Sequence, residues 1–179
     1  MFIDTKSPVP IEEALFQSFI VSFVFNCPSA TVVSKKKENP KRFNPVSTRG
    51  CSFRERGITG TLLTTMTAQI KKRVDFYKKA EKNQKVEDLF ESISNNEKIV
   101  FRENAQMSDA EAVYYYIRNA FAHGSFEYIP ARKLYKLESK KDDNVKAQMI
   151  LSESALQKLA ELSSADKKFI ENLQRKRRK

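Results

Sequence analysis

Apolar residues recur at steps of three and four positions along most of the chain. This spacing places them on one side of an amphipathic helix. It predicts helices over residues 11–25, 60–82, 86–94, 109–123 and from Ser152 or Ser154 to 162, followed by a last helix capped by Ser164. Residues 11–25 are rich in β-branched and aromatic side chains that also suit a buried strand, but the length of this segment favours a helix.

Clean alternation of apolar and polar residues, the pattern of a half-buried strand, is confined to residues 145–151. A less regular counterpart covers residues 133–138, and the polar residues 141–144 suit a hairpin turn between the two. Residues 97–106 hold an apolar trio, and we interpret them as a connector. The pattern therefore predicts a mainly α fold with one small β-hairpin after the helix over residues 109–123.

Proline and glycine interrupt the helical pattern between residues 26 and 58. Proline removes a backbone donor that helices and sheets need, so this basic segment is expected to be a long, mobile loop. A chain of 179 residues, 40% of them hydrophobic, has the length of one domain and enough apolar residues for a core. We therefore expect a single domain over residues 1–174 and a basic C-terminal tail over residues 175–179.

The predicted helix over residues 109–123 carries His123, the only histidine of the chain. Ser108 and Glu111 have the spacing of a capping box, which predicts that the helix starts at Asp109. Gly124 is placed to supply a left-handed C-terminal cap. The helix should therefore end at Ala122 or His123.

Two side chains near the end of this helix suit phosphate chemistry. The ordinary pKa of histidine lies near neutrality, so His123 suits general acid–base catalysis. Arg118 offers planar, permanently charged donors to a phosphate. The two residues are five positions apart, about 140° around an ideal helix, so one helix alone does not bring them together. The alternative is that His123 only stabilises the helix C-terminus through the helix dipole.

The string Arg118-Asn119-Ala120-Phe121-Ala122-His123-Gly124 resembles the signature of the HEPN superfamily. Proteins of this superfamily are helical, and an R-N-x-x-x-H pattern near the end of a late helix forms a ribonuclease site across a homodimer. The succession of helix, hairpin and closing helix is similar to that of plasmid- and phage-associated HEPN families with RNA-targeting defence or toxin roles. The resemblance covers about residues 60–165.

The resemblance implies a HEPN-like helical bundle and a homodimer. It also implies catalytic roles for Arg118, His123 and Asn119. Asn119 could orient the imidazole or bond the ribose, and the resemblance favours the first role. RNA carries its own nucleophile, the 2′-hydroxyl, so cleavage needs a base, an acid and positive charge, but neither a metal nor another cofactor. One histidine does not readily serve as base and acid at once, whereas two histidines from a dimer do. The expected activity is metal-independent endoribonuclease activity, with an antitoxin or another defence-system protein as a further partner.

The net charge of +11 is concentrated in residues 35–56 and 175–179. Two basic segments beside a balanced domain are typical of a protein that binds a polyanion, here RNA. The alternative is that they are merely solvated. The residues expected to contact RNA are the basic side chains of these segments and one tyrosine that could stack on bases, namely Lys35, Lys36, Lys37, Lys41, Arg42, Arg175, Arg177, Arg178 and Tyr115. The run Tyr114–Tyr116 is alternatively part of the core or of a dimer interface.

Other features narrow the class of protein. Cys27 and Cys51 fit neither a metal site nor a disulfide framework, and the acidic N-terminal residues do not suit an export signal. The longest apolar run is too short to span a membrane, so a cytoplasmic location is expected. No helix-turn-helix or zinc pattern points to DNA.

The alternative function is a non-catalytic HEPN module that binds RNA or acts as an adaptor in a larger complex.

Overall fold

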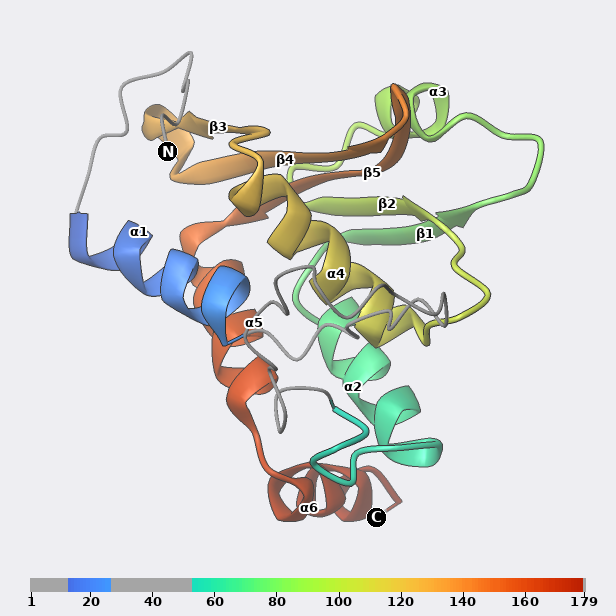
Figure 1. Ribbon diagram of the computed structural model, residues 1–179, viewed down its shortest axis with the longest axis vertical. Coiled ribbons are helices and arrows are strands. Elements are labelled where there is room, and N and C mark those ends of the chain that lie inside the picture. Colours follow the sequence, from blue (N-terminus) through green and yellow to red (C-terminus); the bar gives the residue numbers. More distant parts are fainter. Residues whose placement is uncertain (1–12, 27–52, 179) are drawn as a thin grey trace, which may run out of the picture.

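The computed structural model describes residues 13–26 and 53–178, and every element named below lies in these residues (Figure 1). In chain order, the helices are α1 (Glu13–Ile20), α2 (Thr61–Lys71), α3 (Val86–Glu91), α4 (Asp109–Ala122), α5 (Glu153–Ser164) and α6 (Lys167–Arg178). A π-helical turn, η1 (Val21–Phe25), continues α1, and a 3₁₀ turn, η2 (Pro130–Arg132), precedes the hairpin. The strands are β1 (Phe76–Ala80), β2 (Lys98–Arg102), β3 (Phe126–Ile129), β4 (Leu134–Lys141) and β5 (Asn144–Ser152).

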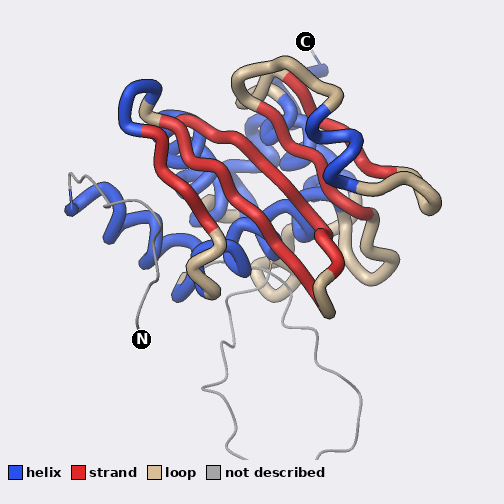
Figure 2. The backbone as a smooth tube through the Cα atoms, turned by 90° about the horizontal axis from the view of Figure 1, so that it is seen from above, coloured by secondary structure: helices blue, strands red, loops and turns tan. Residues whose placement is uncertain are grey.

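The strands form one five-stranded sheet in the order β1-β2-β5-β4-β3. β1 and β2 are parallel, and every other neighbouring pair is antiparallel. Helices α1, α2, α4 and α5 cover one face of the sheet, and α3 packs on the other (Figure 2). The protein is therefore an α/β fold built on a mixed sheet. The expectation of a mainly α, HEPN-like helical bundle with one small hairpin is wrong.

The connector expected at residues 97–106 contains β2, an inner strand that lies between β1 and β5. Ile99 and Phe101 face the core under the helices, whereas Val100 packs with α3 on the opposite face. A strand buried on both faces reads as a continuous apolar run rather than as an alternation. The missing alternation is the physical reason why the sequence pattern alone does not indicate a strand at this position.

The helix expected over residues 60–82 ends at Lys71, and β1 follows it. Val74 and Tyr77 continue the apolar stripe of α2 in sequence, and both pack against the same core as α2. Their spacing therefore mimics another helical turn. The backbone N–H groups of Asp75 and Phe76 instead donate to the carbonyl of Glu97, which ties the start of β1 to β2.

The hairpin predicted after the motif helix is present as β4 and β5. Asp142 and Asp143 connect the strands, and both have a positive φ, 51° and 58°. Two left-handed central residues make a type I′ turn, which matches the twist of the flanking strands. The helix after the hairpin is also confirmed, since Ser152 accepts a hydrogen bond from the backbone N–H of Ala155 at its start.

The core under the helices is rich in aromatic rings. Phe121 of α4 lies at its centre, with ring centroids 5.3–6.5 Å from those of its neighbours. These neighbours come from α1, η1, β3 and β4, and they are Phe16, Phe19, Phe23, Phe126 and Tyr135. α4 is thus held by both the sheet and the N-terminal helical segment.

Of the expected mobile loop, residues 27–52 lie outside the described part of the chain. Its last residues form a turn in which Phe53 and Ile58 are fully buried and Gly57 has a φ of +74°. Near the C-terminus, α6 continues through Arg178, into the segment expected to be a basic tail.

Candidate active site

The first turn of α4 is fixed by the predicted capping box, which is confirmed. The backbone N–H of Glu111 donates to Ser108 Oγ at 3.3 Å, and the backbone N–H of Ser108 donates to Glu111 Oε2 at 2.8 Å. Asp109 is the first helical residue, as predicted. A capping box satisfies two of the backbone donors that a helix start leaves unpaired.

Arg54 completes this arrangement from a distant part of the chain. Its Nε and Nη2 donate to the two carboxylate oxygens of Glu111 at 3.0 and 3.3 Å. The Glu111 side chain is 1% exposed, whereas that of Arg54 is 59% exposed. A permanently charged guanidinium therefore lies over the first turn of α4. The sequence pattern marks Arg54 only as part of a basic loop.

The surroundings of Glu111 act on its pKa in two directions. Burial by itself raises the pKa of this carboxyl, but hydrogen bonds from Arg54 and Ser108 outweigh it and hold the pKa below its ordinary value. A carboxyl whose pKa is lowered by folding stabilises the native state above its unfolded pKa, which lies near pH 4. This contribution is lost as the pH falls through the lower, folded pKa.

Replacing Arg54 with alanine is expected to lower the free energy of unfolding by about 2 kcal/mol at pH 7, because the buried Glu111 carboxylate loses its charged donor. The loss should shrink at pH 3, where the parent protein is losing the stabilisation that the ionised Glu111 supplies. Urea denaturation at both pH values measures it. Lys82→Ala, at an exposed site with no side-chain ion pair among the described residues, is the control. An Arg54→Ala loss that is equal at pH 7 and pH 3 would contradict this account.

The end of α4 is closed by the glycine cap predicted at Gly124. Gly124 has a φ of +67°, its N–H donates to Phe121 O, and the N–H of Ser125 donates to Ala120 O at 2.8 Å. These two bonds make a Schellman motif, which ends a helix sharply. His123 is therefore the C-cap residue, and its side chain is exposed where the chain turns towards β3.

The accessible part of α4 includes two of the three predicted catalytic residues, Arg118 and Asn119. Between Ala110 and Ala122, the residues that are not buried are Tyr115, Arg118, Asn119 and Ala122. On an ideal helix they form one stripe, and His123 borders it on the side of Asn119. We call these five residues, 115, 118, 119, 122 and 123, the accessible stripe of α4.

Three polar side chains of this stripe have no partner in residues 13–26 and 53–178, the part of the chain that the structure describes. The side chains of Arg118, Asn119 and His123 make no hydrogen bond or ion pair to any part of the chain that the structure describes. Arg118 and Asn119 are half-buried, so neighbouring atoms restrict their side chains. The stripe therefore presents a cation, an amide and an imidazole that are all available to a ligand.

The tyrosines of α4 have different environments. Tyr114 is fully buried and donates its hydroxyl hydrogen to Leu159 O at 2.8 Å, and Tyr116 donates to Arg102 O at 3.1 Å. Both belong to the core, as the alternative interpretation held. Tyr115 is half-buried on the accessible stripe, with its ring 5.4 Å from that of Tyr116.

The residues expected to bind RNA are only partly placed. Lys35, Lys36, Lys37, Lys41 and Arg42 lie outside the described residues. Arg175 is exposed on α6, and only the helical backbone of Arg177 and Arg178 is described. Figure 1 shows α6 at the opposite end of the molecule from the junction of α4 and β3. The basic C-terminal segment and His123 are therefore not brought together within one chain.

Residues 13–26 and 53–178 also bear on other kinds of site. No helix there has the length and apolar character to cross a membrane. No group of three or more His, Cys, Asp or Glu side chains gathers there with the proximity that a metal ion would need.

Comparison of the chain with protein-family models, with curated proteins and with solved structures finds no match.

Proposed function

We propose that this protein is an endoribonuclease that cleaves RNA through the RNA's own 2′-hydroxyl. The observation that carries the proposal is the accessible stripe of α4, where His123, Arg118 and Asn119 are exposed or half-buried and have no described intramolecular partner. The proposal uses the resemblance to the HEPN superfamily only for the motif and for the chemistry that the motif implies. The helical bundle of that superfamily is not part of it.

The reaction needs one proton acceptor and one proton donor. A neutral imidazole takes the proton of the 2′-hydroxyl, the 2′-oxygen forms a bond to phosphorus, and the bond from phosphorus to the 5′-oxygen breaks. An imidazolium gives its proton to the leaving 5′-oxygen. The products are a 2′,3′-cyclic phosphate and a 5′-hydroxyl. Arg118 would hold the phosphate oxygens, where charge accumulates in the transition state.

Two copies of the chain supply both imidazoles. The 140° step that separates Arg118 from His123 on one helix ceases to matter if two accessible stripes face each other about a two-fold axis. His123 would then act as base and the partner subunit's His123 as acid. Asn119, one turn before His123, would orient its imidazole. Ala122, between Arg118 and His123, leaves room for close approach of the two helices.

The biological setting is a further part of the proposal. RNA cleavage by such a site suits a defence or toxin system of the cytoplasm, in which an antitoxin or another partner protein restrains the nuclease. On an ideal helix Glu111, with which Arg54 forms an ion pair, lies one turn before Tyr115 and two turns before Arg118, so the exposed Arg54 guanidinium is a further basic group near the accessible stripe.

The test is incubation of the purified protein with 5′-labelled RNA in excess EDTA. We expect cleavage in EDTA, with 2′,3′-cyclic phosphate and 5′-hydroxyl ends, because the proposed chemistry uses side chains alone. Mass spectrometry of the fragments identifies both ends. Activity that disappears in EDTA and returns with magnesium would show that the proposed mechanism is wrong.

The same assay over a range of protein concentrations tests the composite site. Specific activity should fall on dilution as dimers dissociate, and sedimentation under the same conditions should show the change in mass. A species that sediments as a monomer and cleaves at the full rate would refute the two-copy site. The metal-independent chemistry would still be tested separately by the EDTA assay.

A further inference from the structure

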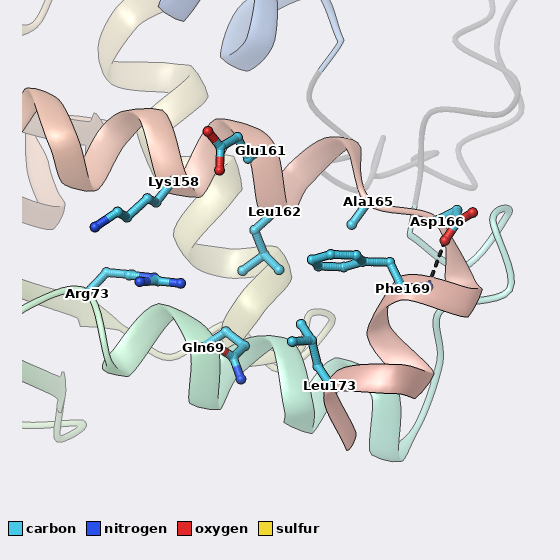
Figure 3. A pocket seen from close by; sticks show the side chains of 9 residues that line it. All are labelled: Gln69, Arg73, Lys158, Glu161, Leu162, Ala165, Asp166, Phe169 and Leu173. Atoms are coloured by element: carbon cyan, nitrogen blue, oxygen red, sulfur yellow. Dashed lines mark hydrogen bonds between the residues drawn. The ribbon is translucent and has the colours of Figure 1, made fainter. Parts of the chain in front are cut away.

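A cavity lies between α2, α5 and α6 (Figure 3). Its volume is about 440 Å³, which falls within the size range of small-ligand sites. Leu162 of α5 and Phe169 and Leu173 of α6 form an apolar end, and Figure 3 shows the ring of Phe169 pointing toward Leu162. Phe169 is 51% exposed, so this ring is open to a ligand.

The other end of the cavity is cationic. Arg73, just after α2, and Lys158 of α5 both line this end (Figure 3). Neither side chain makes a hydrogen bond or ion pair within the described residues, and Arg73 is half-buried. Two carboxylates also line the cavity. Asp166 is occupied at the start of α6, where it accepts from the N–H of Phe169 at 2.7 Å, and Glu161 is exposed on the rim.

A second hollow, of about 430 Å³, shares Phe169 and Leu173 with the first. Arg175 and Lys176 line it, and both are exposed. Phe169 thus lines two hollows, one that also contains Arg73 and Lys158 and one that also contains Arg175 and Lys176. An exposed aromatic ring with a pair of cations in each of the two hollows that it lines fits a polyanion that carries flat rings.

We propose that this surface docks single-stranded RNA, with one base stacked on Phe169 and the neighbouring phosphates held by the two cation pairs. The choice of RNA rests on the proposed function, and the site deepens it by giving the substrate a second contact remote from His123. Stacking on an exposed aromatic residue within a basic groove is how proteins bind single strands without reading their sequence. Gln69, which also lines the cavity, offers an amide to the edge of the stacked base.

A membrane surface is the competing occupant of a basic amphipathic helix, and it fits less well. Helices that lie on membranes present a broad apolar face that enters the lipid. Phe169 is the one large apolar side chain of α6 that is classed as exposed among the residues described, and Ile170 is fully buried in the core. One ring in a concave surface suits one base better than it suits a lipid layer.

The experiment measures binding without cleavage. A fluorescent oligoribonucleotide with 2′-O-methyl groups at every position cannot be cleaved, and anisotropy with the full chain gives its dissociation constant. Phe169→Ala should weaken binding about tenfold, in the range expected for the loss of one stacked base. Phe169→Tyr should bind like the parent. Phe25→Ala is the matched control, since Phe25 is 67% exposed on η1, away from the cavity.

The electrostatic part is tested by salt titration. Arg73→Gln should reduce the slope of log affinity against log salt concentration by about 0.7, the value for one phosphate contact in a single strand. Lys82→Gln, which removes one exposed charge elsewhere, should leave that slope unchanged.

Each outcome decides one of the two proposals. The docking site would be overturned if Phe169→Ala bound the oligonucleotide as tightly as the parent protein, or if the parent protein did not bind it. Either result would count even if the protein cleaves RNA. Binding that depends on Phe169 in a protein that does not cleave would support the docking site and refute the nuclease. Anionic vesicles are a second probe. If the parent protein sediments with the vesicles, Phe169→Ala does not, and both bind RNA equally well, the surface binds membranes and the docking site for RNA is refuted.

Discussion

Replacing His123 with alanine is expected to lower the rate of RNA cleavage by roughly 10²–10⁴-fold, the usual contribution of a general acid or base. The affinity for uncleavable 2′-O-methyl RNA should stay nearly unchanged, because the imidazole acts on protons rather than holding the phosphate. Single-turnover cleavage and anisotropy measure the two quantities separately. The substitution should be well tolerated by the fold, since His123 is exposed and its side chain has no described partner.

Arg118→Ala serves as the companion variant. It should reduce the cleavage rate to a similar extent and also weaken RNA binding, because Arg118 would contact a phosphate directly. Arg118→Lys should restore part of the affinity but less of the rate, since lysine cannot form the bidentate contact. If His123→Ala cleaves RNA as fast as the parent protein, the catalytic role fails, and binding without turnover remains as the function of the stripe.

Replacing Phe121 with alanine is expected to destabilise the protein by about 3–5 kcal/mol, the usual cost of deleting a buried aromatic ring. Phe121 lies within the motif, between Asn119 and His123, but it faces inward and is 1% exposed. Its ring packs against the rings of Phe16, Phe19 and Phe23 and against the sheet. The loss would be a large fraction of the roughly 5–15 kcal/mol by which most domains are stable.

Denaturation in urea gives the change in the free energy of unfolding for Phe121→Ala. Phe25→Ala is the control, because this phenylalanine is 67% exposed and should change stability by no more than about 0.5 kcal/mol. Equal small losses in the two variants would mean that the aromatic cluster around α4 does not form as described. Activity measured below the melting transition separates this effect from catalysis.

The motif helix could be predicted closely because its signals are local. Ser108, Glu111 and Gly124 define both ends of α4 through contacts within a few residues. The hairpin is equally local, since its turn and its alternation lie in one stretch of the chain. Such features depend on neighbours in sequence, so the sequence alone carries them.

The sheet could not be predicted because its pairing is non-local. β2 is recognisable as a strand only when β1, β5 and α3 surround it, and these elements lie before and after it in the chain. β1 has two lysines among five residues, so it lacks the apolar character of a strand. The spacing of Val74 and Tyr77 happens to match the three- and four-residue steps of the preceding helix α2, so the sequence pattern extends that helix too far.

The surroundings of the candidate site could not be predicted for the same reason. Arg54 and Glu111 are far apart in sequence, and a charged residue in a basic loop gives no sign of its partner. The cavity beside Phe169 is formed by α2, α5 and α6, and no pattern within one stretch of the sequence predicts it. The sequence does reveal that Phe169 occurs in a strongly basic helix, which is the signal that could have led to this surface.

The order of strands in the sheet also constrains how the chain can fold during synthesis. β3, β4 and β5 follow one another directly in the chain, so their pairing closes only short loops. The pairing of β2 with β5 joins Lys98 to Ile150 and therefore closes a long loop. Synthesis proceeds from the N-terminus, so β2 exists for some time before its antiparallel partner has been made. During that interval the edge of β2 that later pairs with β5 has no partner, and Lys98 and Arg102, which flank the apolar residues Ile99–Phe101, are charges of the kind that keep such a segment from aggregating.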